Sequence, residues 1–234
     1  PHQAVYKAST GKFRRVHDGR ARPYKSAYSL NDCLEKGPNL MASILHILIG
    51  FRKEKWAAKA DIEQAFPQVG IVPKDRDVLR CLWIENDHVV IYRFARLPFG
   101  LACSPFILQA TLRKHLGENN VDDKTMQNFV ASIYVDDSVW SENNLDKLYD
   151  RKDFYTKLFR ECGMNFRDWT SNHPDARASF AKLENREAKL EESTLGMYWN
   201  TQKDILRVNS ERLKELIKKK IRTKRDLWKI IPSI

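Results

Sequence analysis

Hydrophobic positions with helical spacing mark two long segments of the chain, and helix-start residues mark a third. In residues 39–53 and 145–162 apolar residues recur every three or four positions, which places them on one face of a helix. Residue types that favour helix starts and helix ends stand at the expected boundaries. The predicted helices cover residues 39–53, starting near Pro38 or Asn39; residues 104–117, with Ser104 as the N-cap and Pro105 at the first helical position; and residues 145–162, ended by Gly163.

Short apolar runs between turn residues predict the strands. The clearest hairpin joins residues 78–84 to residues 89–94 through a turn at Asn86 and Asp87. A second hairpin, over residues 129–140, carries Asp136 and Asp137 at its tip. Further strands are expected at residues 4–6 and 57–62, a strand pair is expected near 164–170 and 194–208, and a basic helix is expected after Ser210. Hairpins with interspersed helices and no linker predict an α+β fold with an antiparallel sheet.

Charge and composition narrow the classes of partner. The chain has 234 residues and a net charge of +11, from 41 basic and 30 acidic residues. This surplus favours a polyanionic partner, although a solvated basic protein fits the charge equally well. No apolar run is long enough to span a bilayer and no lipid-anchor motif is present, so no membrane partner is expected. The four cysteines lack zinc-ligand and redox spacing, which predicts free thiols in a reducing compartment.

Three acidic residues are the strongest candidates for chemistry. Two adjacent acids at a hairpin tip repel each other, and a divalent cation relieves that repulsion. Asp61 follows a buried strand, and neighbouring strands of one sheet can bring it to Asp136 and Asp137. Three carboxylates can hold two Mg²⁺ ions about 3.5–4 Å apart, the spacing of two-metal phosphoryl-transfer sites. The Asp-Asp pair by itself fits an ordinary turn better.

The residues around the acids resemble the motifs of reverse transcriptases. Tyr134-Val135-Asp136-Asp137 resembles the Y-x-D-D hairpin of that family. The segment from Ala60 to Phe66 resembles its first acidic motif, and the segment from Leu97 to Phe106 resembles its L-P-x-G-x-x-x-S-P motif. Finer matches point to the Pao/BEL class of LTR retrotransposons: Pro1 to Lys7, Ser29 to Leu34 with Gly37 to Leu40, Leu195 to Trp199, and Thr223 to Arg225. The resemblance runs from residue 1 to about residue 231.

The resemblance implies a right-hand polymerase fold with an antiparallel palm sheet packed on helices. The fingers are expected at about 1–36 and 69–103, the palm at about 37–68 and 104–200, and the start of the thumb or connection at 201–234. The chain begins at Pro1 and ends at Ile234 in mid-pattern, so we expect a segment of a longer polyprotein. Its other segments (thumb or connection, RNase H, integrase) are expected partners, and cytoplasmic retrotransposon particles are the expected location.

The resemblance also assigns roles to particular residues. The metal ligands are Asp61, Asp136 and Asp137 with the backbone carbonyl of Ile62, and the ions are two Mg²⁺, for which Mn²⁺ can substitute. The nucleotide-binding residues are Lys7, Arg14, Phe66, Phe99 and Gly100, and Phe66 excludes the 2′-hydroxyl of ribonucleotides. The primer grip consists of Met197, Tyr198 and Trp199. Each of these residues also has a possible structural role without a function. Lys7 and Arg14 would be exposed cations, Phe66 a core ring, Gly100 a turn glycine, and residues 197–199 a hydrophobic strand.

An RNA-directed DNA polymerase is therefore the expected activity, with dNTPs and an RNA or DNA template bearing a primer as its partners. A palm-type RNA polymerase also carries an Asp pair, but Phe66 argues against it. One departure favours a third reading, a decayed or domesticated nucleic-acid-binding module without catalysis. The family's fourth motif usually supplies a lysine, whereas residues 165–169 read Asn-Phe-Arg-Asp-Trp. Arg167 does not readily give up a proton.

Overall fold

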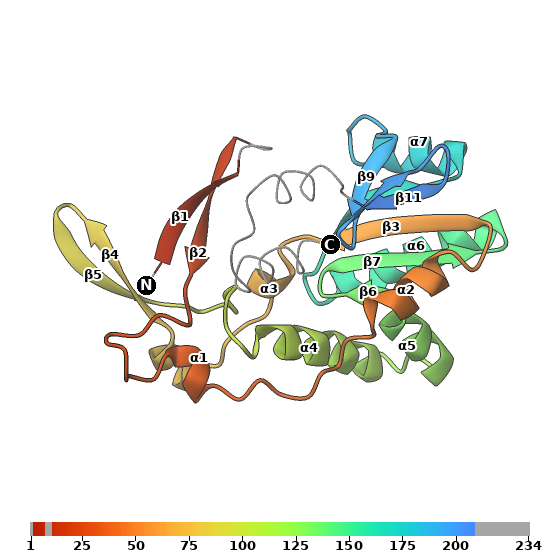
Figure 1. Ribbon diagram of the computed structural model, residues 1–234. Helices are drawn as coiled ribbons and strands as arrows, with labels where there is room; N and C mark the ends of the chain where they lie inside the picture. Colours follow the sequence, from red (N-terminus) through yellow and green to blue (C-terminus); the bar gives the residue numbers. More distant parts are fainter. Residues whose placement is uncertain (1, 8–10, 209–234) are drawn as a thin grey trace, which may run out of the picture. The chain divides into compact units, whose positions relative to one another are not determined.

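The computed structural model describes residues 2–7 and 11–208, which form two compact units (Figure 1). The first unit combines Pro1–Met41, Glu63–Asn128 and Leu158–Met164, and the second combines Ala42–Ile62, Phe129–Lys157 and Asn165–Ile234. The helix expected after Ser210, with the basic run from Arg212 to Arg225, lies outside the described residues. Within the described ranges, no helix is long and apolar enough to cross a membrane.

The first unit contains two hairpins and a set of helices. Strands β1 (His2–Lys7) and β2 (Lys12–His17) pair antiparallel, as do β4 (Arg80–Glu85) and β5 (His88–Arg93). The helical elements are α1 (Leu30–Cys33), α3 (Ala65–Gln68), the 3₁₀ helix η1 (Pro73–Val78) and α4 (Ser104–Glu118), and α5 (Asp123–Val130) continues into the second unit. The buried face of α4 carries Leu108, Leu112 and Leu116, all fully inaccessible to solvent, which makes this helix the core of the unit.

The β4–β5 hairpin confirms the predicted turn. Asn86 and Asp87 have φ angles of 47° and 63°, the left-handed conformation that a two-residue turn requires of both central residues. The register pairs Leu82 with Ile91 and Ile84 with Val89, so these four side chains share one face of the hairpin. Their exposed fractions are 60%, 59%, 68% and 67%, respectively. We call these four residues the aliphatic face of β4–β5.

The second unit is built on a four-stranded sheet with the order β6-β7-β3-β8, antiparallel throughout. Its strands are β3 (Trp56–Ile62), β6 (Ile133–Tyr134), β7 (Asp137–Glu142) and β8 (Phe166–Ser171), and its helices are α2 (Ile44–Phe51), α6 (Leu145–Arg160) and α7 (Pro174–Leu183). A separate three-stranded sheet orders β11 (Ile205–Val208), β10 (Met197–Asn200) and β9 (Glu191–Thr194).

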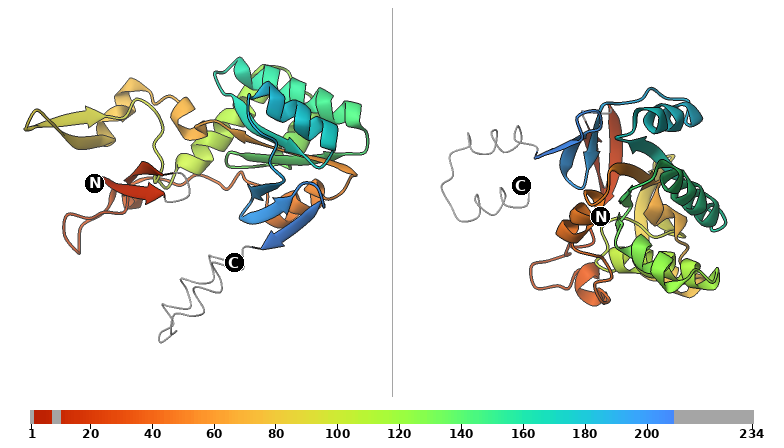
Figure 2. Two further views of the ribbon diagram at one scale, coloured as in Figure 1. Left: turned by 90° about the horizontal axis from the view of Figure 1, so that it is seen from above. Right: turned by 90° about the vertical axis from the view of Figure 1, so that its right-hand side faces the viewer.

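Helices α6 and α7 cover one face of the four-stranded sheet, and α2 with β10 covers the other (Figure 2). On the first face Trp140 and Trp169 pack edge to face with centroids 5.6 Å apart, and contact Tyr155 of α6 and Phe180 of α7. On the second face a cluster joins the two sheets through Ile47, Phe51, Ala57, Val139 and Trp199, each at most 1% exposed. Both faces of the central strands are thus buried along most of their length.

Several predicted boundaries are wrong. Helix α2 begins after Ser43, whose Oγ accepts the His46 N–H at 3.2 Å, and not near Pro38 or Asn39. Helix α4 is not capped by Ser104: Cys103 is the N-cap, Pro105 is not the first helical residue, and Ser104 Oγ donates to the Pro98 carbonyl at 2.8 Å.

The strand expected from residue 129 starts only at Ile133, because residues 123–130 form helix α5. Residues 164–170 and 194–208 do not pair as expected. Strand β8 pairs with β3, whereas β10 pairs with β9 and β11, and helix α7 lies between them in the sequence.

Candidate active site

The three candidate acids lie at one end of the four-stranded sheet. Asp61 on β3 is the direct register partner of Asp137 on β7. Asp136 occupies the two-residue turn between β6 and β7, after Val135 with a φ of 58°, and its carbonyl accepts the Ile62 N–H at 2.9 Å. The sheet therefore brings together the residues that the sequence separates into two motifs. Asp136 is in the turn as expected, whereas Asp137 already begins the second strand.

Burial raises the pKa of all three acids, and repulsion by a neighbouring acid adds to the effect at Asp61 and Asp137. The pKa of Asp61 is raised to about 6, mainly by burial and further by the negative charges of Asp136 and Asp137, against the opposing effect of Arg167. Burial also raises the pKa of Asp136 and of Asp137, although Lys59 lowers both. Strongly perturbed carboxyl groups that repel one another are typical of functional sites, since ordinary folding gains nothing from the repulsion.

Arg167 faces Asp61 from the opposite neighbour strand. Its Nε lies 3.4 Å from Asp61 Oδ2, and the register of β8 aligns the two residues. The alignment depends on an irregularity, because Asp168 and Trp169 on β8 together face the single residue Ala60 on β3. Asp168 has a φ of 54°, as an extra residue in a bulge often does. The bulge points the Trp169 ring into the core and leaves Arg167 beside the acids.

The three acids are of a residue type that suits a divalent cation, but two of them face cationic side chains in this structure. Carboxylate oxygens are the ligands that Mg²⁺ prefers, and three of them converge on one end of the sheet. Asp61 is directed to Arg167, however, and Asp137 lies 4.0 Å from Lys59 Nζ. Among the described residues, no group of three or more His, Cys, Asp or Glu side chains stands in a metal-binding arrangement. Holding an ion thus requires Asp61 to turn from Arg167, whereas Asp137 and Lys59 are too far apart to hydrogen-bond, so Asp137 can bind an ion with Lys59 still beside it.

In the first unit, two candidate nucleotide-binding rings contact each other. Phe66 of α3 and Phe99 pack edge to face with centroids 4.7 Å apart. Phe66 is 6% exposed and Phe99 is 51% exposed, so Phe99 forms the outer surface of the pair. Phe66 is therefore a core ring of this unit as well as a candidate selectivity residue.

Gly100 is a glycine for a steric reason. Its φ is +96°, and a Cβ atom there would lie 2.5 Å from the carbonyl oxygen of His17. Asn31 fixes the same turn from the other side: its Nδ2 donates to the Gly100 carbonyl at 2.9 Å, and its Oδ1 accepts the Ala102 N–H at 2.8 Å. Close packing of three backbone segments holds this turn in place.

Phe66 and Gly100 line one cavity of about 790 Å³. Three cationic side chains, Arg20, Arg22 and Lys36, contribute to the same lining, and Arg22 pairs with Asp32 at 3.0 Å. The sequence interpretation did not include these three as a group. The only indication of these cations in the sequence was the basic composition of residues 20–36, and their spacing does not distinguish them from other surface cations.

Lys7 and Arg14 lie on the β1–β2 hairpin. The register pairs Lys7 with Lys12 and Arg14 with Val5. Their backbone positions place them on neighbouring strands of one hairpin.

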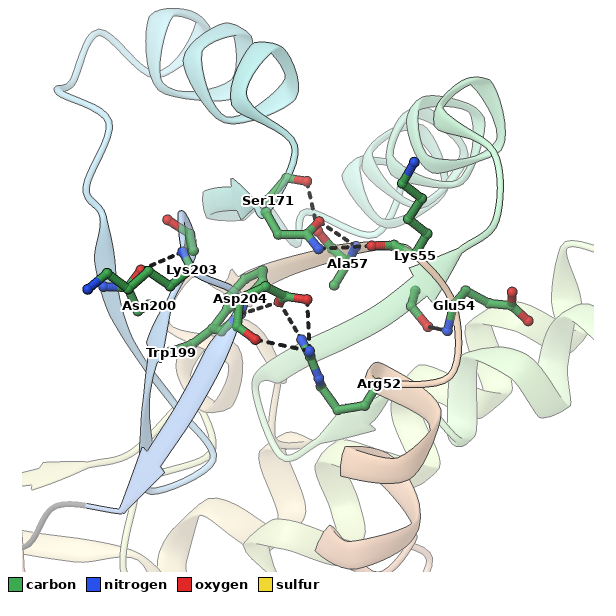
Figure 3. A network of polar contacts seen from close by, with 12 residues as sticks. Arg52, Glu54, Lys55, Ala57, Ser171, Trp199, Asn200, Lys203 and Asp204 are labelled. Atoms are coloured by element: carbon green, nitrogen blue, oxygen red, sulfur yellow. Dashed lines mark hydrogen bonds and ion pairs between the residues drawn. The ribbon is translucent and has the colours of Figure 1, made fainter.

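The proposed primer-grip residues lie on β10, and differ in exposure. Tyr198 is 38% exposed, whereas Trp199 is fully buried and packs on Phe51 with ring centroids 4.8 Å apart. Trp199 Nε1 donates to Asp204 Oδ1 at 3.0 Å, and Asp204 accepts from Arg52 through both carboxylate oxygens (Figure 3). Trp199 is thus the anchor of this strand, and Tyr198 faces outward.

Comparison with known proteins identifies a sequence family and similar folds. The family described as reverse transcriptase (RNA-dependent DNA polymerase) matches residues 5–168. No curated protein sequence matches the chain. The structure resembles that of the foamy viral protease-reverse transcriptase in complex with an RNA/DNA hybrid, at 19% identity and a TM-score of 0.64 over 100% of this chain and 26% of that one.

Two other structures of the foamy viral protein are similarly close. The form in complex with dsDNA matches at 20% identity and a TM-score of 0.63, over 100% of this chain and 41% of that one. The dRH form in complex with dsDNA matches at 19% identity and a TM-score of 0.65, over 98% and 34%. The chain therefore spans a quarter to two fifths of the length of these proteins. At this identity the likeness establishes the fold, with its mixture of helices and antiparallel sheets in a palm and fingers architecture.

Proposed function

The chain belongs to the reverse transcriptase family, and from this premise we propose that it transfers deoxynucleotides from dNTPs to a primer 3′-hydroxyl under the direction of an RNA or DNA template. One observation carries the proposal. Asp61, Asp136 and Asp137 converge at one end of an antiparallel sheet; burial raises the pKa of all three, and repulsion by a neighbouring acid raises it further at Asp61 and Asp137. This arrangement costs stability unless a cation relieves it.

The carboxylates of Asp61, Asp136 and Asp137 and the carbonyl of Ile62 are the groups that would hold two Mg²⁺ ions, or Mn²⁺ in their place. Bound there, the ions would supply charge neutralisation and a more acidic primer hydroxyl. The chain's own residues supply the position: β3 presents Asp61, the β6–β7 turn presents Asp136, and the first residue of β7 is Asp137. Arg167 keeps a fixed positive charge beside them.

The first unit supplies the nucleotide-binding residues in this proposal. Phe66 supports the sugar of the incoming nucleotide and excludes a 2′-hydroxyl by steric clash, since its ring is held in place by Phe99. The turn at Gly100 faces the nucleotide and the template, and the cations of the β1–β2 hairpin, Lys7 and Arg14, bind the triphosphate. Arg20, Arg22 and Lys36, which line the same cavity as Phe66, add positive charge for a nucleic-acid phosphate.

The β10 strand contacts the primer end. Tyr198 is the exposed aromatic residue of the proposed primer grip, and Met197 is its neighbour at the turn. Trp199 contributes indirectly, because its buried indole attaches β10 to α2 and to Asp204. The grip thus combines an exposed contact residue with a buried anchor.

The source we infer is a Pao/BEL-class LTR retrotransposon. The support is the run of motifs from Ser29 to Leu40 and from Leu195 to Trp199. In that setting the chain works as a polyprotein segment beside thumb or connection, RNase H and integrase segments, within cytoplasmic particles.

Primer extension tests the activity directly. An RNA template with a DNA primer, dNTPs and Mg²⁺ is given to the protein and to Asp136→Asn, and extension is followed on a gel. We expect extension by the protein and none by Asp136→Asn, with equal binding of the template–primer by both. Binding without extension by the protein itself, in Mg²⁺ and in Mn²⁺, would contradict the proposal.

That last outcome would instead support a non-catalytic nucleic-acid-binding module. The observation that favours this second candidate is Arg167, which stands where the family usually has a lysine and pairs with Asp61 at 3.4 Å. An arginine holds its proton too firmly to act as a general acid. In this reading the +11 charge binds nucleic acid and Arg167 neutralises an unused acid.

A further inference from the structure

Lys59 is a buried cation on the same face of the sheet as Asp61 and Asp137. It lies two residues before Asp61 on β3, so both side chains leave the strand on one side. Only 7% of Lys59 is exposed. Burial of an ammonium group is costly unless it is paired and hydrogen-bonded, so the partners of Lys59 show what its burial achieves.

Two groups from different sheets meet at the Lys59 ammonium. Its Nζ lies 4.0 Å from Oδ1 of Asp137 on β7, and it donates a hydrogen bond to the Ser193 carbonyl on β9. Ser193 is the register partner of Tyr198 on β10. A single buried cation therefore connects a candidate catalytic acid with the strand next to the candidate primer-contact residue.

A second contact joins the same two elements. The carboxylate of Asp137 accepts the backbone N–H of Leu195, which follows β9. Leu195 and Gly196 form the two-residue turn between β9 and β10, with φ angles of 49° and 81°. Asp137 thus accepts a hydrogen bond from the turn of this hairpin, while Lys59 donates a hydrogen bond to strand β9, just before the turn.

We propose that Lys59 is a positioning residue, whose ammonium fixes the β9–β10 hairpin to Asp137 so that the primer-contacting strand and the catalytic acids keep one relative position. The inference rests on the proposed polymerase function, and it adds a residue that the family motifs do not assign. Loss of the Lys59 ammonium leaves the Ser193 carbonyl without this donor and Asp137 with the Leu195 N–H. The hairpin then moves relative to the acids, and the primer hydroxyl is misplaced.

The experiment compares the protein with Lys59→Met, Lys59→Arg and a matched control, Lys53→Met. Lys53 lies in the same unit, and its side chain is 75% exposed. Single-nucleotide extension gives the rate at saturating dNTP and the KM for dNTP. Hydrogen exchange of the amides from Leu195 to Tyr198, measured without nucleic acid, reports the attachment of the hairpin independently of catalysis.

For Lys59→Met we expect extension at saturating dNTP to slow about tenfold or more while KM for dNTP changes less than about threefold, because the chemistry is misaligned and nucleotide binding is not. Exchange of the Leu195 to Tyr198 amides should accelerate by about tenfold. Lys59→Arg should restore both readouts to within about threefold of the protein, since it keeps the charge and the donors. Lys53→Met should change neither.

Two outcomes overturn the proposal: extension by Lys59→Met at the rate of the protein, or slow extension with unchanged amide exchange. If Lys59→Met does not fold, Lys59→Gln is measured by the same criteria. Absence of extension by the unmodified protein refutes the polymerase proposal instead. The exchange measurement then still decides whether Lys59 fixes the hairpin, so the two failures are distinguishable.

Discussion

Asp61 of β3 and Asp137 of β7 face each other directly in antiparallel register. Like charges at directly opposite positions of a sheet are destabilising, and burial adds to the cost. The raised pKa of Asp61, at about 6, reports that cost, with burial as its main cause and the two neighbouring acids next. The three acids therefore lower the free energy of unfolding at this end of the sheet, as expected where carboxylates must bind a charged ligand.

Asp61→Asn should accordingly stabilise the metal-free protein while abolishing extension. Because the pKa of Asp61 is raised by folding, the charged form destabilises the fold above pH 6, and the cost disappears as the pH falls below 3.8. After allowance for solvent screening, we expect a gain of about 1–2 kcal/mol in unfolding free energy at pH 7.5 and little gain near pH 4. Urea unfolding at both pH values measures it, with the exposed Asp150→Asn as control.

Phe66→Val should admit ribonucleotides. The smaller side chain leaves room for a 2′-hydroxyl, so the ratio of rNTP to dNTP incorporation should rise about tenfold or more. Loss of the contact with Phe99 should also lower stability by about 1–3 kcal/mol. Competitive primer extension measures the ratio. Phe129→Val, which truncates a fully buried ring elsewhere, should lower stability without changing the ratio, and an unchanged ratio in Phe66→Val refutes the assignment.

Gly100→Ala should destabilise the first unit. The new Cβ would lie 2.5 Å from a backbone carbonyl, at a φ of +96° that alanine rarely adopts. We expect a loss of about 2 kcal/mol or more. Gly117→Ala is the matched control, because it lies in α4 with open space around its Cβ, and should stabilise by about 0.5–1 kcal/mol. Thermal unfolding of the two variants should thus shift in opposite directions.

Asp204→Asn should loosen the three-stranded sheet from α2. Burial alone would raise the pKa of Asp204, but hydrogen bonds from Arg52 and Trp199 outweigh it and lower the pKa. The side chains of Arg52 and Asp204 are each about a third exposed, so we expect a cost of about 1–2 kcal/mol at pH 7. Since the folded pKa is lowered, wild-type stability from this group is present above pH 3.8 and is lost on further acidification.

A double-mutant cycle with Arg52→Ala isolates the contribution of the pair. If the two single substitutions are additive, the ion pair does not carry the attachment. Any effect of Asp204→Asn would then come from the bond to Trp199.

The sequence was informative where local pattern and tertiary burial agree. The apolar run at residues 57–62, the turn at Asn86 and Asp87 and the acidic hairpin all satisfy local rules, and each was predicted near its observed position. The acidic residues were brought together by motif order, since their separation along the chain carries no geometric information. Family membership was predicted from these motifs and is confirmed by the match over residues 5–168.

The remaining features depend on packing that local pattern does not encode. Phe129 and Val130 suggested a strand, but they close helix α5, where Phe129 packs on Tyr155. Helix α7 was missed because its buried face consists of small and polar residues, with only Phe180 as a large apolar side chain. Lys59 carried one available signal, a charged residue inside an apolar strand at the spacing that shares a face with Asp61.

The aliphatic face of β4–β5 has a consequence for the colloidal behaviour of the protein. Copies of a chain with a charge of +11 repel each other at low ionic strength, which keeps four exposed aliphatic side chains apart. At about 1 M salt the Debye length falls to about 3 Å, and the charge repulsion no longer keeps two copies of the chain apart. We expect solubility to fall as salt rises. Light scattering along a salt series should detect it, and Ile84→Lys with Ile91→Thr should restore clear solutions.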